Sequence, residues 1–146
     1  MSPSINESAE RDVYLNLLRA QELLISEFEE LFRANGLTHT QFNVLRILVT
    51  SSEKALPCQV IGENLLNRVP DVTRLIDRME KAGLVTRKRS AEDRRVVLVQ
   101  ITSRGKRACE SLYGDVDKLH RKQLSHLSAS KLKSLDAGLR AVLARS

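Results

Sequence analysis

The sequence predicts a mainly helical protein with one small β-hairpin, and three observations lead to this fold class. Apolar residues recur at helical spacing over most of the 146 residues. Two short β-rich runs, 84–88 and 96–101, break that spacing; seven polar residues separate them, as in a hairpin with a long tip. Positive charge is concentrated in the same third of the chain as this hairpin.

The N-terminal part of the chain is expected to form two helices. Residues 11–34 carry an apolar stripe and end at an Asn-Gly pair, which favours helix termination. Thr38 can cap a second helix that runs from His39 to about Val49. Residues 50–57 are expected to form a loop that leads into the next helix.

The middle of the chain is expected to form two shorter helices joined by a turn. Residues 58–66 make the first, and its Gly62 indicates close packing on a neighbour. Asn67 is predicted to cap the second, over about 69–82, with Pro70 in its first turn. One face of this second helix is apolar, and the other carries Asp71, Thr73, Arg74, Asp77, Arg78 and Lys81.

Two further helices are expected after the hairpin. Thr102 is predicted to begin a helix that continues to about His120, and Ser128 is predicted to cap a last helix with a leucine stripe. The apolar stripes within 13–32 and 112–143 are larger than one small domain can cover. Burial against a second copy of the chain is therefore expected.

The charge distribution favours a polyanionic partner. Residues 1–65 have a net charge of −4, residues 66–107 a net charge of +7 and residues 108–146 a net charge of +3. Such a local basic excess is typical of nucleic-acid binding, and a solvated basic surface is the alternative. Aromatic residues make up only 3% of the chain, which argues against stacking on single-stranded bases.

Several other classes of function are not expected. The N-terminal twelve residues are polar, and no apolar run has the length of a signal peptide or membrane span, so a cytoplasmic protein is expected. The two cysteines have no CxxC spacing, so neither a disulfide framework nor a metal site is expected. The three histidines are isolated, and no catalytic or cofactor motif occurs; an enzyme or a bound cofactor is not expected.

Two helices joined by a turn and followed by a hairpin predict a winged helix-turn-helix. The helix at 69–82 is narrow enough for the major groove of DNA, where Arg can bind guanine with ~1–3 kcal/mol of discrimination. Residues near its N-terminus are the ones expected to reach bases. The candidates on and before this helix are Arg68, Pro70, Asp71, Thr73, Arg74 and Arg78.

The hairpin is predicted to act as a wing that reaches the minor groove. Arg95 is the candidate for entering that groove, where the negative potential is deep. Asp93 is expected to hold its guanidinium by a bidentate bond. Lys88, Arg89 and Arg94 are expected to contact phosphates. For each of these charges the alternative is a solvated side chain without a binding role.

Three stretches, LTHTQFNVLRIL, VTRLIDRMEKAGLVTRK and DRRVVLVQITSRG, carry a resemblance that is most specific over residues 37–105. They resemble the MarR family of bacterial transcription regulators, the multiple-antibiotic-resistance-type repressors. The wing pattern of that family is Asp-x-Arg, an apolar strand and then Ile-Thr-x-x-Gly. Here it is Asp93-Arg94-Arg95 and, after the strand, residues 101–105.

The resemblance implies a domain plan and a mode of action. Residues 1–36 and 106–146 would be dimerisation helices that flank a winged DNA-binding domain at 37–105. The homodimer would bind a pseudo-palindromic operator, with recognition helices one helical turn, ~34–36 Å, apart. A repressor that a small phenolic or other anionic ligand releases is expected. The chain departs from the family pattern at Arg68, Pro70 and Asp71, so its base preference is its own.

The means of sensing is left with alternatives. Positions that match the ligand cleft of similar proteins are Arg19, Thr40, Phe42 and Arg46, for which core packing or surface charge is the alternative. A redox switch would use Cys58, because a helix N-terminus can lower the pKa of a thiol. A constitutive architectural DNA binder of the same fold is a further alternative. A winged helix that binds only proteins would have a neutral or acidic recognition face, unlike this one.

Overall fold

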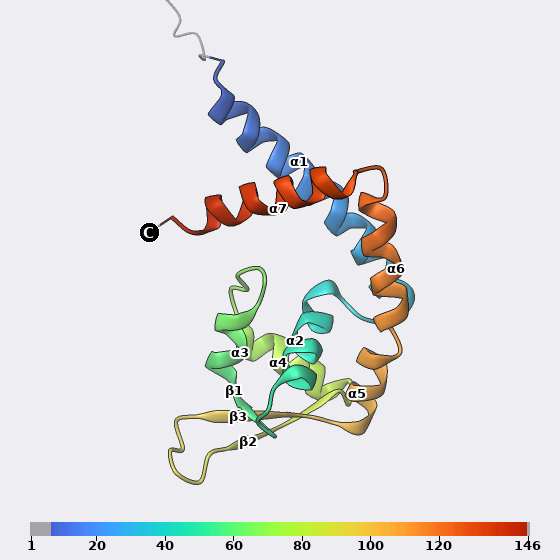
Figure 1. Ribbon diagram of the computed structural model, residues 1–146. Helices are drawn as coiled ribbons and strands as arrows, with labels where there is room; N and C mark the ends of the chain where they lie inside the picture. Colours follow the sequence, from blue (N-terminus) through green and yellow to red (C-terminus); the bar gives the residue numbers. More distant parts are fainter. Residues whose placement is uncertain (1–6, 146) are drawn as a thin grey trace, which may run out of the picture. The chain divides into compact units, whose positions relative to one another are not determined.

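The computed structural model describes residues 7–145; the first six residues of the polar N-terminal stretch lie outside this range. The predicted fold class is confirmed: helices dominate, and a small antiparallel sheet lies at one end of the first part of the chain (Figure 1). The chain divides into two compact units, one that ends at Leu112 and one that begins at Tyr113.

The first unit contains five helices and three strands among the described residues. In chain order they are α1 (Ala9–Ala34), α2 (His39–Thr50), β1 (Leu56–Pro57), α3 (Cys58–Asn64), α4 (Val72–Lys81), β2 (Val85–Arg89), β3 (Val97–Ile101) and α5 (Ser103–Glu110). The second unit contains α6 (Tyr113–Leu124) and α7 (Ala129–Leu143).

A tight turn joins α1 to α2 as the sequence predicts. Gly36 adopts the left-handed conformation, with φ of 74°, that an Asn-Gly helix end favours. Thr38 then caps α2: its hydroxyl accepts from the Gln41 N–H at 3.0 Å, and the Gln41 side chain accepts from the Thr38 N–H at 3.1 Å. This reciprocal pair fixes where α2 begins.

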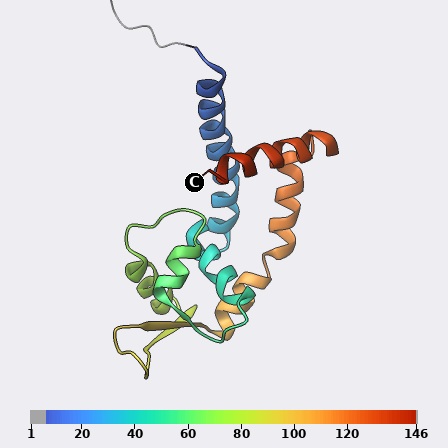
Figure 2. The same cartoon turned by 60° about the vertical axis from the view of Figure 1, so that its left-hand side comes forward.

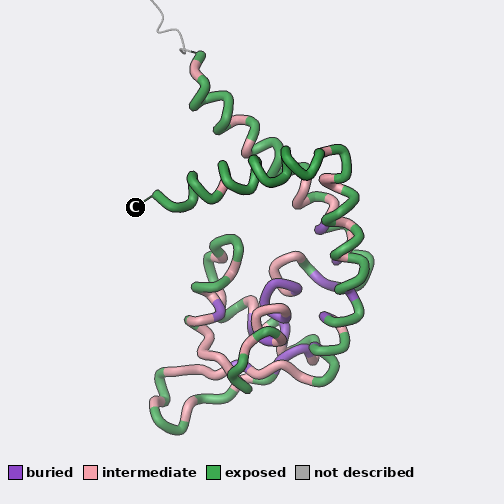
Figure 3. The backbone as a smooth tube through the Cα atoms, viewed as in Figure 1, coloured by how far each residue is buried: buried purple, intermediate pink, exposed green. Residues whose placement is uncertain are grey.

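Aromatic rings hold α1 against α2. Phe32 is buried, and its ring centroid lies 4.5 Å from that of Phe42 and 5.5 Å from that of His39. Phe28 lies on the same side of α1, 5.9 Å from Phe32. Five of the twelve residues of α2 are buried, more than in any other helix that the structure describes, and they form purple segments in Figure 3. The core of the first unit therefore forms around α2.

The sheet has the strand order β1-β3-β2, and both pairings are antiparallel. In the long hairpin, Val85 lies opposite Ile101 and Arg89 lies opposite Val97. The prediction of a loop over the whole of 50–57 is wrong at its end, because Leu56 pairs with Val99. Two residues are too few to give an alternating pattern. Pro57 is tolerated because β1 is an edge strand.

The turn between α3 and α4 is longer than predicted. The helix predicted over 69–82 begins only at Val72, so Pro70 precedes the helix and does not lie in its first turn. Asp71, not Asn67, is the N-cap: its carboxylate accepts from the Arg74 N–H at 3.0 Å. A carboxylate at this position also interacts favourably with the helix dipole.

Close packing at Gly62 is confirmed. A methyl group built there would lie 3.0 Å from a methyl carbon of Val72, so α3 and α4 approach each other at this point. Ile61, Ile76 and Met79 are fully buried between the two helices and the sheet. One face of α4 is thus fixed to the core.

The chain after the hairpin is tied back to the turn that precedes it. The Thr102 hydroxyl donates to the carbonyls of Gly83 at 2.7 Å and Leu84 at 3.0 Å, and it accepts from the Gly105 N–H at 3.0 Å. Thr102 is therefore the N-cap of α5, as predicted, and a link between α5 and the α4–β2 turn.

The single helix predicted from Thr102 to about His120 is wrong. α5 ends at Glu110, and α6 begins at Tyr113. The Leu112 N–H bonds to the carbonyl three residues back, at 3.1 Å, which tightens the helical path. The Ser111 hydroxyl also donates to a backbone carbonyl of α5 at 3.1 Å. Apolar spacing continues through this point, so the sequence pattern did not reveal the break.

The second unit exposes its apolar residues. Ser128 caps α7 as predicted, accepting from the Lys131 N–H at 3.2 Å. Among the described residues of α6 and α7 none is buried. The exposed apolar residues of α7 are Leu132, Leu135, Val142 and Leu143, and those of α1 in the first unit are Val13, Tyr14, Leu18 and Leu23.

Within residues 7–145, every helix falls short of the length and apolar character that crossing a lipid bilayer requires. The same residues contain no group of three or more His, Cys, Asp or Glu side chains placed to hold a metal ion.

Candidate nucleic-acid interface

Helix α4 has one buried face and one exposed face. Ile76 and Met79 are fully buried, whereas Thr73, Arg74 and Arg78 are exposed. This division follows from the 3.6-residue period of the apolar positions, which the sequence already displays. The exposed face is free to present cations and a hydroxyl group to a partner.

The residues that precede α4 lie in the turn. Arg68 and Pro70 are exposed there, at the N-terminal end of the helix. Asp71 is also exposed, but one of its oxygens already accepts the Arg74 N–H as a cap. Its position fixes where α4 starts and so where Thr73 and Arg74 stand. The structure brings these predicted site residues together on one end of α4.

The hairpin extends beyond the helices of the first unit (Figures 1 and 2). The bidentate pair predicted at its tip is present: Arg95 Nε donates to Asp93 Oδ1 at 3.1 Å, and a terminal guanidinium nitrogen donates to Oδ2 at 3.2 Å. The Arg95 backbone N–H donates to Oδ1 at 3.0 Å. These bonds lower the pKa of Asp93, so the carboxylate stays charged and its partner stays oriented.

Arg95 combines this orientation with full access to solvent. Its side chain is 91% exposed, against 42% for Asp93. An exposed ion pair of this kind adds little to stability. Its effect is to restrict the rotamers of a cation that projects from the tip.

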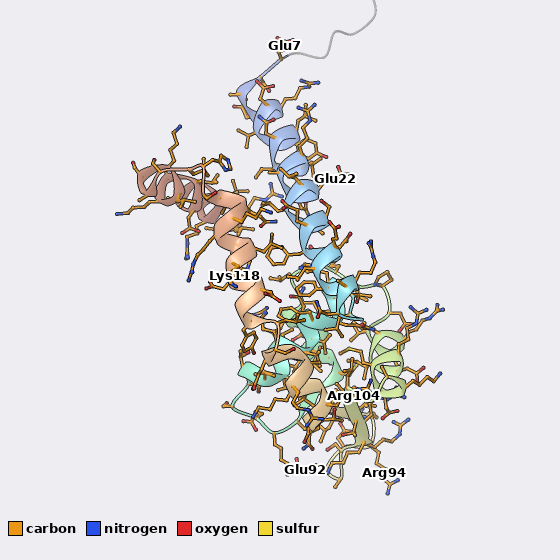
Figure 4. The ribbon with its side chains drawn as sticks, turned by 90° about the vertical axis from the view of Figure 1, so that its right-hand side faces the viewer. Glu7, Glu22, Glu92, Arg94, Arg104 and Lys118 are labelled. Atoms are coloured by element: carbon orange, nitrogen blue, oxygen red, sulfur yellow. The ribbon has the colours of Figure 1, made fainter. Side chains whose placement is uncertain are left out.

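A second arginine, which the sequence predicts as a phosphate contact, holds the loop of the hairpin. Arg89, on β2, donates to the backbone carbonyl of Arg94 at 2.8 Å across the hairpin. The side chain of Arg94 is exposed, and Figure 4 places Glu92 and Arg94 at the outer end of the hairpin. Lys88 is exposed on β2. Nothing in the sequence pattern distinguishes Arg89 from its basic neighbours, because its partner is a backbone atom.

A third arginine, Arg87, joins the hairpin to α4. Its guanidinium bonds to Asp77 at 3.0 Å and to Glu80 at 3.2 and 3.3 Å. The apolar periodicity places Asp77 on the polar face of α4 but indicates no partner for it, and it does not distinguish Arg87 from the other basic residues of the hairpin. The available signal was two acids three residues apart on a helix, followed by a basic residue on the next strand.

A pocket of about 510 Å³ lies where α3, α4 and the hairpin meet. Its lining combines apolar side chains, among them Ile76 and Val97, with the cations Arg87 and Arg95 and the acid Glu63. Cys58, at the start of α3, also lines it, and burial raises the pKa of this thiol above its ordinary value. Desolvation raises the pKa of the Cys58 thiol more than a hydrogen bond with Thr73 and the charge of Arg87 lower it, so the net shift is opposite to the lowering expected from the helix N-terminus.

The four positions suggested for a ligand differ in their surroundings. Arg19 is exposed on α1, and Thr40 is half-buried near the start of α2. Phe42 is buried and stacks on Phe32. Arg46 lines a separate pocket of about 340 Å³ with Ile47, Thr50, Ser51, Leu56, Val60 and Asn64.

Comparison with known proteins agrees with this geometry. The model of the MarR family matches residues 37–97. The HTH-type transcriptional regulator FarR of Neisseria gonorrhoeae is 28% identical over 111 residues, which cover 76% of this chain and 75% of FarR. Among solved structures, the MarR transcription factor from Planctomyces limnophilus is 34% identical, with a TM-score of 0.72 and coverage of 94% of this chain and 99% of that one.

Solved structures similar to this chain include complexes with DNA. A MarR mutant from E. coli complexed with operator DNA is 26% identical, with a TM-score of 0.74 and coverage of 92% of each chain. The family match runs from just before α2 to the first residue of β3, and similarity to the solved structures extends over nearly the whole chain. The chain belongs to the MarR family and is a DNA-binding transcription regulator.

Proposed function

We propose that this regulator binds a pseudo-palindromic operator as a homodimer, with α4 in the major groove and the β2–β3 hairpin in the minor groove. The observation that carries this proposal is that α4 and the hairpin both present exposed basic side chains. α4 presents Arg74 and Arg78 opposite its buried face, and the hairpin presents Arg95 on a bidentate carboxylate. A helix suits the wide groove, and an arginine on a narrow tip suits the narrow one.

The direct reading of bases is assigned to the N-terminal half of α4. Thr73 and Arg74 follow the Asp71 cap, and Arg78 is one turn further along the same helix. Arg68 and Pro70, exposed in the turn before the helix, are placed to contact the DNA backbone and a base edge. On the hairpin, Lys88 and Arg94 would contact phosphates, with Asp93 as the positioning residue for Arg95.

The apolar surface of the helices outside the helix-turn-helix supports a homodimer. α7 exposes Leu132, Leu135 and Val142, and α1 exposes Val13 and Leu18. Exposure of so many apolar side chains to water is unfavourable, so a partner is expected to cover them. A two-fold symmetric operator requires that this partner be a second copy of the chain. A measured monomer at micromolar concentration would contradict this part of the proposal.

We also propose that a small phenolic or other anionic ligand releases the regulator from DNA, so that it acts as a repressor. The pocket beside Arg95 combines apolar side chains with two cations and one acid, Glu63, and this net positive lining supports binding of such a molecule. A ligand there would compete with the hairpin's contacts to DNA. Arg46 lines the second, smaller candidate pocket. A redox switch at Cys58 is less favoured, because burial disfavours the reactive thiolate.

The test is selection of bound sequences from random double-stranded DNA, with and without phenolic acids. We expect enrichment of a two-fold symmetric site and loss of binding with one of the ligands. Binding to all sequences with equal affinity would instead identify a constitutive architectural protein. Light scattering on the DNA-free chain measures the oligomeric state independently.

A further inference from the structure

Arg87 contacts α4, the helix assigned to the major groove, through its backbone as well as its side chain. The Arg87 N–H donates to Glu80 Oε2 at 2.9 Å, while the guanidinium bonds to Glu80 Oε1 and to Asp77 Oδ1. β2 is an edge strand, and its residue 87 lies opposite Val99 of β3. Glu80 therefore holds both the main chain and the side chain of the hairpin.

The two acids come from one face of α4, because they lie three residues apart. Asp77 also pairs with Lys81 at 3.2 Å, one turn further along the helix. The Arg87 side chain is only 26% exposed, the least of any cation whose ion pair the described residues display. Charge-assisted bonds with this geometry and partial burial restrict motion more than exposed pairs do.

By charge alone, these two acids are expected to weaken binding to DNA. Two carboxylates on the helix that approaches DNA repel its phosphates, so their removal should increase affinity. The two carboxylates are compatible with tight DNA binding if they contribute to it in another way than by their charge. What the contacts offer is a rigid connection between α4 and the hairpin, the two elements assigned to different grooves.

We propose that Asp77, Glu80 and Arg87 are positioning residues that form a brace, which holds α4 and the hairpin at the angle needed to enter both grooves at once. This inference rests on the proposed function, since it assumes that both elements contact one DNA duplex. Without the brace, α4 and the hairpin can each still bind DNA. The hairpin must then become ordered against α4 on binding, and this ordering reduces the binding free energy.

The decisive variant is Glu80→Ala, because the brace and simple electrostatics predict opposite signs. The brace predicts about five- to tenfold weaker binding to the selected operator, since preorganisation is lost. Charge removal alone predicts tighter binding. Glu92→Ala is the matched control: it removes one acid from the hairpin tip, outside the brace, and should bind as tightly as the wild type or more tightly.

A double-mutant cycle separates the brace from a direct phosphate contact by Arg87. If Arg87 acts through Glu80, then Arg87→Ala, Glu80→Ala and the double variant should have similar affinities. If Arg87 contacts DNA, the effects of the two single variants should have opposite signs and should add, and Arg87→Ala should also reduce the salt dependence by about one phosphate. That second pattern would overturn the brace.

Affinity is measured by fluorescence anisotropy, at a temperature where circular dichroism finds each variant folded. Glu80→Gln, which keeps the shape of the side chain, should weaken binding in the same direction if Glu80→Ala is too unstable to use. Arg95→Ala is included as the test of the proposed function. Unchanged affinity of Arg95→Ala would refute the wing assignment; loss in Arg95→Ala with wild-type affinity in Glu80→Ala would refute the brace alone.

Discussion

Gly105 permits the close approach of α5 to the α4–β2 turn, and replacing it by alanine should destabilise the protein strongly. A methyl group at this position would collide with the backbone carbonyl of Leu84 and lie 2.9 Å from a side-chain carbon of Ile101. The carbonyl cannot move freely, because it accepts from the Thr102 N–H at 3.1 Å and from the Thr102 hydroxyl at 3.0 Å.

The size of the effect follows from these contacts. Overpacking against a fixed group costs ~1–3 kcal/mol. Displacing the carbonyl weakens two hydrogen bonds of about 1 kcal/mol each. Alanine recovers about 1 kcal/mol through its better helix propensity. The net expectation for Gly105→Ala is a loss of about 2–4 kcal/mol in the free energy of unfolding.

The assay is urea unfolding at one fixed protein concentration, with Gly138→Ala as the matched control. Gly138 is also inside a helix, α7, but a methyl group there meets no atom within 4 Å. This control should be unchanged or more stable by up to about 1 kcal/mol. A Gly105→Ala variant as stable as the wild type would refute the argument, because it would mean that α5 shifts without cost.

Three further predictions concern binding and pH. Arg95→Ala should weaken operator binding by about tenfold or more while the chain stays folded, and Asp93→Ala should have a smaller effect in the same direction; wild-type affinity in both would exclude a role for the tip. Operator affinity should fall steeply with salt concentration, because several phosphates are neutralised, and a flat dependence would count against the whole interface. Burial lowers the pKa of His39 below its ordinary value, with Glu29 opposing, so the unfolded chain binds a proton more readily. The free energy of unfolding should therefore be greatest above about pH 6.5 and decrease on acidification below it; His39→Gln should flatten this decrease, and an identical pH profile would contradict the assignment.

The hairpin tip was predictable because its interactions are local. Asp93 and Arg95 are two residues apart, so their side chains meet in almost any tight turn, and the bidentate pair could be expected from the sequence. The Thr102 cap was predictable for the same reason, since an N-cap hydroxyl bonds to a backbone group three residues on.

The brace was not predictable in this way, because it depends on a turn. Arg87 reaches Asp77 and Glu80 only because Gly83, with φ of 77°, reverses the chain between α4 and β2. The N-cap of α4 was mistaken because Asn67 and Asp71 are both good capping residues. Propensity alone does not choose between them. The choice depends on the path of the turn, which tertiary packing at Gly62 and Val72 restricts.

The contact between Glu80 and the backbone of Arg87 has a consequence for solubility. β2 is an edge strand, and an edge with unpaired N–H groups can recruit a strand from another molecule and begin aggregation. Here the carboxylate already occupies the N–H of Arg87, and the three consecutive basic residues 87–89 make strand addition electrostatically unfavourable. Lys88, which is assigned to a phosphate contact, thus also helps to keep the sheet from growing at that edge.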